Sequence, residues 1–497
     1  MPRSSSQVTA RLRVAIIGAG FGGIATAVNL QRAGITDFVV FERADGPGGT
    51  WHLNRYPGCE VDINSQLYSF SFMPYDWPRT HSGQAELQRY AEDTIDHFGI
   101  RSHFRFGAGV AAASWNDVDH RYLVTLENGE RHHFEVVVAS VGLFNAPKYQ
   151  DWPGLDEFQG AALHSARWDP GLDLGGKTVG LIGTGSSSVQ ITPNLAESVK
   201  HLYVFQREAG WVLPKNCGPY RERVRARWRR RPWLQKLARF KQWAVYEAML
   251  KNAWTSGSRQ NAKLEKICRE FIADEIPDPE LRRLVTPSHP FACKRPLFTD
   301  TFYAALQRDN VTLVPHAVTA LTTDAIVSAD GIKRKIDALV MATGFQTQRY
   351  LAGLDVRDAH GRELDQVWNG TPEAFLGITV PGFPNFFMVY GPNTNGGSSI
   401  ILMLERQAEA IARSVARLRS SHAAVIETRP FAHRLYTRWL NRENDRRWTA
   451  ARYCNNYYFS ATGQNVTQYP RSSLHYRVIV RLFFGLGTAA RGRRSNP

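Results

Sequence analysis

The sequence predicts an α/β protein in which two Rossmann-like, dinucleotide-binding domains share one chain. An apolar run, a glycine-rich turn, a helix-like stretch and a second apolar run follow one another at residues 13–42, and the same order returns at residues 177–207. Residues 216–285 are rich in Arg, Lys, Leu, Ala and Trp without strand-like alternation, which predicts a helical insertion. The expected domains are a discontinuous first domain at 1–150 and 330–497, a second domain at 151–215 and 286–329, and the insertion at 216–285.

The first unit opens with a β-branched run at residues 13–17, of the kind that forms a buried parallel strand. The pattern G-x-G-x-x-G follows at Gly18, Gly20 and Gly23. In this pattern the glycines allow a tight turn, a close approach to a pyrophosphate and close packing of helix on strand. The helix N-terminus binds the phosphate charge, and an acid about 20 residues on binds the ribose diol. Glu42 stands at that place.

The second unit repeats the turn with one change and ends in a base. The turn consists of Gly183, Thr184, Gly185, Ser186 and Ser187, and Ser188 stands where the pattern prefers Gly or Ala. Arg207 occupies the place that Glu42 has in the first unit. A cation there removes the ribose ligand and favours a 2′-phosphate, so we expect NADPH rather than NADH.

The net charge and the cysteines limit the kinds of binding partner and site that we expect. The formal net charge is +16, concentrated in residues 221–241 and 476–494, which predicts a solvated helical face or, alternatively, peripheral contact with an anionic membrane. No nucleic-acid-binding signature accompanies the charge, so that partner is not expected. The N-terminal residues lack an apolar segment of the secretory kind. Five scattered cysteines without a C-x-x-C pair argue against a disulfide framework, a zinc site or a dithiol centre. We therefore expect a cytoplasmic protein without a metal site.

A distinctive pattern lies between the two units, F-x-G-x-x-x-H-x-x-x-W-D. Its residues are Phe158, Gly160, His164, Trp168 and Asp169. The pattern resembles the fingerprint of the type I Baeyer–Villiger monooxygenases, class B flavoprotein monooxygenases related to the flavin-containing monooxygenases. A second segment that is similar to this family is G-G-x-W-x-x-x-x-Y-P-G-x-x-x-D, with Gly49, Trp51, Tyr56 and Asp62 at its marked positions.

The resemblance implies cofactors and roles for particular residues. It implies FAD in the first domain, near Gly49, Trp51, Tyr56 and Asp62, and NADPH/NADP⁺ in the second. By the same resemblance, Lys294 reaches the 2′-phosphate and Arg295 reaches over the flavin, where Asp62 modulates it. The step at Thr343 and Gly344 brings backbone amides to the flavin, and His164 acts through cofactor positioning. The glutamate that follows Arg207, where the family often has threonine, weakens the expected phosphate contact.

The reaction that the resemblance implies is NADPH- and dioxygen-dependent oxidation of a ketone to an ester or lactone by way of a flavin peroxide. Arg295 and Asp62 are then the expected catalytic residues. The alternative with the same cofactors is oxygenation of a sulfide or amine. A flavin disulfide reductase would need a C-x-x-C pair, which is absent from the sequence. A non-catalytic, membrane-associated dinucleotide-binding protein is the alternative from another class. The sequence specifies neither the physiological substrate nor the oligomeric state.

Overall fold

The first domain is built on a parallel sheet with the strand order β19-β7-β1-β2-β3. The computed structural model describes residues 12–396, 398–421, 423–454 and 456–492. The strands of this sheet are β1 (Val14–Ile17), β2 (Phe38–Phe41), β3 (Phe104–Arg105), β7 (Val136–Ala139) and β19 (Phe386–Met388). All residues of β1 and β7 are buried, because the sheet is covered on both faces. Helix α1 (Phe21–Arg32) packs beside the long helix α11 (Ile400–Ser421).

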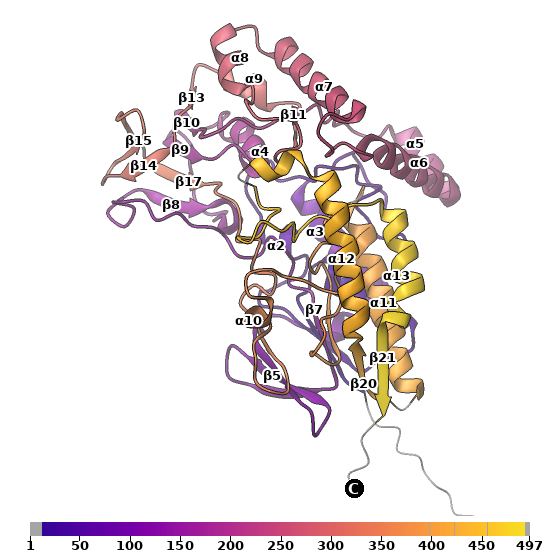
Figure 1. The fold of residues 1–497 in the computed structure, drawn as a ribbon. Helices are drawn as coiled ribbons and strands as arrows, with labels where there is room; N and C mark the ends of the chain where they lie inside the picture. The colour runs from indigo at the N-terminus through magenta and orange to yellow at the C-terminus, as the bar shows by residue number, and fades with distance from the viewer. Residues whose placement is uncertain (1–11, 397, 422, 455, 493–497) are drawn as a thin grey trace, which may run out of the picture.

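The second domain has its own parallel sheet, with the strand order β13-β10-β9-β17-β8. Its strands are β8 (Ala161–His164), β9 (Thr178–Ile182), β10 (His201–Phe205), β13 (Val311–Val314) and β17 (Ala338–Met341). Figure 1 shows this sheet in a lobe of its own, above the first domain. The predicted α/β class with two Rossmann-like sheets is therefore confirmed.

The position of β17 corrects one predicted boundary. We expected the chain to return to the first domain at residue 330, but β17 pairs with β8 and β9 of the second sheet along its whole length. The chain returns to the first domain after Met341. Phe345 there forms an antiparallel bridge with Pro147, in the segment by which the chain first passed to the second domain. An apolar strand pairs equally well in either sheet, so its composition alone did not indicate the correct one.

Smaller elements complete the two domains. In the first domain these are α2 (Thr50–Leu53), α3 (Gln84–His97), η1 (Arg101–His103), β4 (Val110–Asn116), β5 (Arg121–Leu126), β6 (Arg131–Phe134), β18 (Asp355–Arg357), α10 (Leu364–Trp368), β20 (Ala423–Thr428), α12 (Pro430–Arg447), η3 (Ala450–Tyr453), α13 (Ser473–Gly487) and β21 (Thr488–Gly492). In the second domain they are η2 (Ser165–Arg167), α4 (Ser186–Leu195), β11 (Val212–Leu213), β12 (Leu297–Phe298), α9 (Phe302–Leu306), β14 (Val318–Leu321), β15 (Ala325–Ser328) and β16 (Lys333–Lys335).

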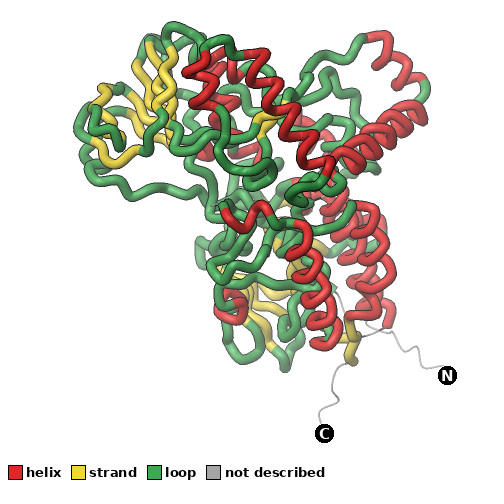
Figure 2. The backbone as a smooth tube through the Cα atoms, turned by 45° about the horizontal axis from the view of Figure 1, so that its top comes forward, coloured by secondary structure: helices red, strands yellow, loops and turns green. Residues whose placement is uncertain are grey.

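The predicted helical insertion is present. It contains α5 (Glu222–Arg230), α6 (Pro232–Leu250), α7 (Arg259–Glu275) and α8 (Pro279–Val285). Figure 1 shows α5 and α6 projecting at the right of the molecule, as Figure 2 does from another side, whereas α8 lies beside α9 of the second domain. Helices α5 and α6 bury none of their residues fully, so they lie against the body by one partly covered face. Within the described residues, no helix has the length and apolar character that crossing a bilayer requires.

Candidate active site

The first glycine turn has the shape that a dinucleotide phosphate requires. Gly18 has φ 104°, and a Cβ there would lie 2.5 Å from the carbonyl oxygen of Ser140, so only glycine fits. A Cβ at Gly23 would lie 1.9 Å from the carbonyl oxygen of Gly18, which explains the close packing of α1 on β1. Gly20 precedes the first residue of α1, whose N-terminal amides are free to bind an anion.

Glu42 lies directly beside this turn, at the end of β2. Its Oε2 accepts a hydrogen bond from the Ala19 amide at 2.7 Å, and its Oε1 accepts one from the Ala44 amide at 2.9 Å. These two bonds fix the carboxylate while each oxygen keeps a lone pair for a hydroxyl donor. The arrangement fits the predicted role of Glu42 as a ribose ligand.

Gly49 connects the first turn to the interior of the protein. Gly49 has φ 56°, and a Cβ there would lie 2.9 Å from the Cα of Gly20. The two backbones are thus in close contact, with no room for a side chain at Gly49. Trp51 follows on α2, is 7% exposed, and donates from Nε1 to the hydroxyl of Tyr68 at 3.1 Å.

The second glycine turn joins β9 to α4 in the same way. Gly183 has φ 109°, and a Cβ there would lie 2.6 Å from the carbonyl oxygen of Ala342. Gly185 has open space around it and precedes Ser186, the first residue of α4. Ser188, which departs from the glycine pattern, is fully buried. A pyrophosphate fits the open N-terminus of α4, which Thr184 and Ser187 also flank.

Arg207, Glu208 and Lys294 meet beside this second turn. Arg207 is exposed at the end of β10, with no carboxylate at ion-pair distance among the described residues. Lys294 forms an ion pair with Glu208, and this contact lowers the pKa of the Glu208 carboxyl below its usual value. The backbone carbonyl of Glu208 accepts a hydrogen bond from Thr184 at 3.1 Å. Arg207 and Lys294, the two residues predicted to bind the 2′-phosphate, therefore lie beside the same turn. Lys294 is already paired with Glu208.

Arg295 and Asp62 form the predicted pair. The distance from Arg295 Nη2 to Asp62 Oδ2 is 3.6 Å, and the side chains are 39% and 16% exposed. Partial burial acts to lower the pKa of Arg295, whereas Tyr457 and Asp62 act to raise it, and the net direction is upward. The guanidinium is therefore charged at any physiological pH.

Gln190 of α4 connects the two domains at this ion pair. Its Oε1 accepts from the Tyr56 hydroxyl at 3.0 Å, and its Nε2 donates to the Glu60 carbonyl oxygen at 3.0 Å and to Asp62 Oδ1 at 3.4 Å. The helix that begins at the second glycine turn thus positions the loop that carries Asp62. Sequence reasoning missed Gln190. The available signal was a polar residue between two apolar ones, Val189 and Ile191, in the helix that follows the second glycine turn.

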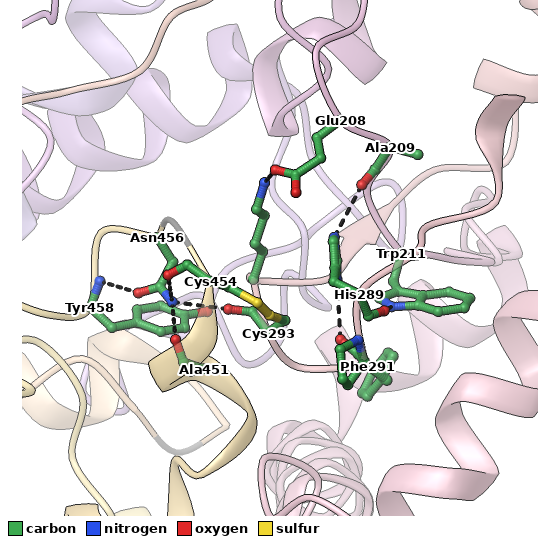
Figure 3. Close-up of a disulfide and its surroundings, with 12 residues drawn as sticks. Glu208, Ala209, Trp211, His289, Phe291, Cys293, Ala451, Cys454, Asn456 and Tyr458 are labelled. Atoms are coloured by element: carbon green, nitrogen blue, oxygen red, sulfur yellow. Dashed lines mark hydrogen bonds and ion pairs between the residues drawn. A yellow bond between two sulfur atoms is a disulfide. The ribbon is translucent and has the colours of Figure 1, made fainter. Parts of the chain in front are cut away.

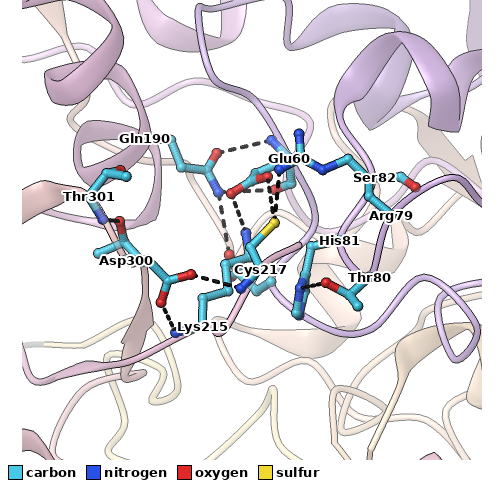
Figure 4. Close-up of polar contacts among 12 residues, drawn as sticks. Glu60, Arg79, Thr80, His81, Ser82, Gln190, Lys215, Cys217, Asp300 and Thr301 are labelled. Carbon is cyan, nitrogen blue, oxygen red and sulfur yellow. Dashed lines mark hydrogen bonds and ion pairs between the residues drawn. The ribbon is translucent and has the colours of Figure 1, made fainter. Parts of the chain in front are cut away.

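A second polar cluster on the same loop was also missed (Figure 4). Lys215 Nζ lies 2.7 Å from Glu60 Oε1, and the lysine side chain is only 1% exposed. The Asp300 carboxylate accepts from the backbone amides of Lys215, Asn216 and Cys217 at 2.7–2.9 Å. The cluster anchors the start of the helical insertion to the Tyr56–Asp62 loop. No local pattern in the sequence indicates it, because its residues come from distant segments.

One large cavity lies between the two domains. Its volume is about 1740 Å³, and its lining includes Trp51, Asp62, Arg207 and Arg295. The second glycine turn lines it directly, whereas the first turn adjoins it through Gly49 and Trp51. Thr343 and Gly344 line it from the crossing after β17, where the Thr343 hydroxyl donates to the Lys148 carbonyl oxygen at 2.6 Å. Among the described residues, no cluster of three or more His, Cys, Asp or Glu has the arrangement of a metal site.

The fingerprint residues lie at the crossing between the domains, outside the cavity wall. His164 ends β8, is 1% exposed, and its ring lies 5.3 Å from that of Tyr149 and 6.0 Å from that of Phe345. Burial lowers the pKa of His164 to about 4, so the ring is neutral at pH 7. A Cβ at Gly160 would lie 2.4 Å from the Asp337 carbonyl oxygen.

The remaining fingerprint residues pack or cap this segment. Phe158 packs against the hydrophobic core of the second domain, and Trp168 directly follows η2 and is half-buried. Asp169 is exposed and accepts a hydrogen bond from the Gly171 amide at 2.9 Å. The fingerprint thus shapes the crossing and does not contact the reacting centre directly. This placement supports a positioning role for His164.

A disulfide joins Cys293 to Cys454, with Cα atoms 5.8 Å apart (Figure 3). It links the residue before Lys294 to the segment that leads to Tyr457, and Asn456 Nδ2 donates to the Cys293 carbonyl oxygen at 3.1 Å. The expectation that the cysteines form no disulfide is wrong for this pair. The two residues are 161 positions apart, so only the fold brings them together.

Comparison with known proteins agrees with this geometry. The model of the flavin-binding monooxygenase-like family matches residues 11–351. A Baeyer–Villiger monooxygenase of Streptomyces coelicolor is 40% identical over 95% of this chain and 91% of its own length. The crystal structure of cyclohexanone monooxygenase from Rhodococcus sp. Phi1 bound to NADP⁺ superposes with a TM-score of 0.86 and 29% identity, covering 97% of this chain and 99% of that one. The OTEMO complex with FAD and NADP has a TM-score of 0.86 and 26% identity, covering 96% and 99%. The chain belongs to the flavin-binding monooxygenase-like family and, within it, to the Baeyer–Villiger monooxygenases.

Proposed function

We propose that this protein uses NADPH and dioxygen to convert ketones to esters or lactones. The observation that carries the proposal is the Asp62–Arg295 ion pair in a cavity bounded by two dinucleotide-binding units, one with an acid and one with a base at the ribose position. The relatives are named Baeyer–Villiger and cyclohexanone monooxygenases, which supports a ketone substrate.

Each cofactor has a set of residues that fits it. We assign FAD to Gly18, Gly20, Gly23, Glu42, Gly49, Trp51, Tyr56, Asp62, Thr343 and Gly344. We assign NADP⁺ to Gly183, Thr184, Gly185, Ser186, Ser187, Arg207 and Lys294. When bound, FAD supplies the redox chemistry that accepts hydride from NADPH and activates dioxygen.

Arg295 stabilises negative charge in the transition state. During oxygen insertion, charge develops on the oxygen that attacks and then on the former carbonyl oxygen of the ketone. A fixed guanidinium stabilises both more strongly in a partly dry cavity than in water. Asp62 holds the guanidinium in place, and Gln190 holds the loop that carries Asp62. The contribution of one such electrostatic group is about 10²–10³ in rate.

The test is a panel of ketones and sulfides, in which NADPH consumption and product identity are measured together. The wild-type protein is expected to yield one ester or lactone per NADPH, and sulfoxide from the sulfides would indicate the alternative activity. Arg295→Ala should still bind FAD and consume NADPH but should form at least about a hundredfold less ester. Arg283→Ala is the matched control, because this exposed arginine on α8 forms an ion pair with Glu280 on its own helix and with no other acid in the described part of the chain. Ester formation at the wild-type rate by Arg295→Ala would refute the assignment.

Two expectations from the sequence stay predictions. They are the cytoplasmic location and the contact of segments 221–241 and 476–494 with an anionic membrane. Residues 493 and 494 lie outside the described part of the chain.

A further inference from the structure

Helix α6 has an apolar row on its outward face. Trp233, Leu237 and Phe240 are 60%, 56% and 59% exposed and follow one another at intervals of four and three residues. Side chains at this spacing lie on one face of a helix. The opposite face is directed at the protein, where Arg239 donates to the Gln66 carbonyl oxygen at 2.5 Å. An amphipathic helix in a folded protein normally directs its apolar row inward, so this arrangement is unusual.

Helix α13 repeats the arrangement. Leu474, Val478, Leu482 and Leu486 are spaced four residues apart and are 45–71% exposed, and Phe483 beside them is 52% exposed. The other face of α13 packs on α11. The two rows account for eight of the fifteen large apolar side chains that are exposed within the described residues. Such a concentration of exposed apolar surface marks an interaction site.

The two helices are in direct contact. Trp243 Nε1 on α6 donates to the Ser473 hydroxyl on α13 at 2.9 Å, and Glu247 Oε1 accepts from the Ser473 amide at 3.1 Å. Figures 1 and 2 both show α6 and α13 along the same side of the molecule. We call this the α6–α13 face, with Trp233, Leu237, Phe240, Leu474, Val478, Leu482, Phe483 and Leu486 as its apolar members.

The charges on this face favour an anionic lipid surface over a second copy of the chain. Residues 473–487 contain no acid. Basic side chains flank the apolar rows and have no ion-pair partner among the described residues, namely Arg230, Arg231, Lys236, Lys241, Arg477 and Arg481. In a symmetric dimer through this face, cations would lie against cations, which is unfavourable. Apolar and aromatic side chains flanked by Arg and Lys are typical of helices that lie in the interface of an anionic membrane.

The cavity meets the same two helices. Trp243, Tyr246 and Leu250 of α6 line it, as do Leu474 and His475 in the first turn of α13. Leu474 is also 51% exposed and belongs to the apolar row, so it lies at the boundary between the cavity and the α6–α13 face. The boundary at Leu474 therefore joins this face to the same cavity that Arg295 lines.

We propose that the α6–α13 face docks on an anionic bilayer and that the substrate is a lipophilic ketone taken up from that bilayer. The inference rests on the proposed function, because it concerns the substrate of the same cavity. It adds the chemical class of the ketone, a long apolar chain or ring system, and the side from which the ketone enters.

Binding is tested by sedimentation of the FAD-loaded protein with vesicles of phosphatidylcholine, with or without phosphatidylglycerol. Binding is expected only to the vesicles with phosphatidylglycerol and should weaken with salt. The variant Leu237→Glu with Leu482→Glu should bind about a hundredfold more weakly, because two apolar contacts are lost and two repelled charges are gained. Val118→Glu is the control, since Val118 is 86% exposed on the β4–β5 turn of the first domain. Absence of wild-type binding, or equal binding by the double variant, would overturn the docking proposal.

Uptake is tested with two ketones, cyclohexanone in solution and a long-chain methyl ketone dissolved in the anionic vesicles. The double variant should oxidise cyclohexanone like the wild type but should lose about tenfold or more of the rate on the vesicle-borne ketone. Equal rates on the vesicle-borne ketone would refute uptake from the bilayer. Failure of the wild type on both ketones would instead count against the proposed function. A wild-type dimer that becomes monomeric in the double variant, with no vesicle binding, would assign the face to a second copy.

Discussion

Replacing Glu208 with glutamine removes the carboxylate that pairs with Lys294, and we expect this change to tighten the binding of NADPH. In the structure Lys294 is paired with Glu208, while Arg207 beside them has no such partner in the described part of the chain. A 2′-phosphate bound here has to compete with Glu208 for Lys294 and is also repelled by the Glu208 charge. Glutamine has nearly the same shape and abolishes both effects.

The magnitude follows from the exposure of the pair. The Lys294 and Glu208 side chains are 25% and 43% exposed, so breaking their ion pair costs only about 0.5–1 kcal/mol. Repulsion between two unit charges about 4 Å apart with water-like screening adds roughly 1 kcal/mol. Together these effects correspond to about a 10- to 30-fold lower dissociation constant for NADP⁺. NAD⁺ lacks the phosphate and should change by less than about twofold.

The assay is titration of the FAD-loaded protein with NADP⁺ and NAD⁺ at low and at high salt, together with the KM for NADPH and NADH. The gain for NADP⁺ should shrink as salt rises, because both charges are partly exposed. Because Lys294 lowers the pKa of Glu208, the gain should be constant across neutral pH. Glu280→Gln on α8 is the control, since the carboxylate that it removes forms an ion pair with Arg283 and with no other base among the described residues. Equal gains for both nucleotides, or weaker NADP⁺ binding, would refute the reasoning.

Other predictions concern stability. Lys215→Met should lower the free energy of unfolding by about 3–5 kcal/mol, because Glu60 is left without its buried cation. Adding Glu60→Gln should restore part of this loss. Urea denaturation measures both changes, and an unchanged midpoint would count against this cluster. Thiol titration of the denatured protein should find the three free cysteines before reduction and all five after it. Cys454→Ser leaves Cys293 free and should therefore abolish the difference between the two counts. Five thiols without reductant would contradict the disulfide. Burial lowers the pKa of His164 from 6.5 to about 4, so the unfolded chain takes up the proton first as pH falls. The free energy of unfolding should therefore decrease by up to ~3 kcal/mol between pH 6.5 and pH 4. His164→Asn should make that pH dependence shallower, and an unchanged profile would argue against a neutral buried ring.

Much of the site was predictable because its chemistry depends on local sequence. A glycine turn between strand and helix, with an acid or a base at the end of the next strand, is a pattern of one continuous segment. The structure accordingly places Gly18, Glu42, Gly183 and Arg207 as that pattern requires. The pairing of Asp62 with Arg295, 233 positions apart, was expected only through family resemblance, and the structure brings the two within 3.6 Å.

The contacts that the sequence did not indicate all join distant segments. Gln190 binds the Asp62 loop, Lys215 pairs with Glu60, and Cys293 bonds to Cys454. Strand β17 belongs to the second sheet, although its apolar sequence suits either one. These contacts depend on which surfaces of distant segments pack together in the folded protein.

The two glycine turns, the acid and the base that follow them, and the helical composition of residues 216–285 were all readable from the chain alone, because they are properties of neighbouring residues. The ion pair of Lys294 with Glu208 and the exposure of two apolar helix faces beside the cavity became visible only in the folded protein. Both depend on the packing of segments that are far apart in the chain, where burial and partner are set by the whole fold.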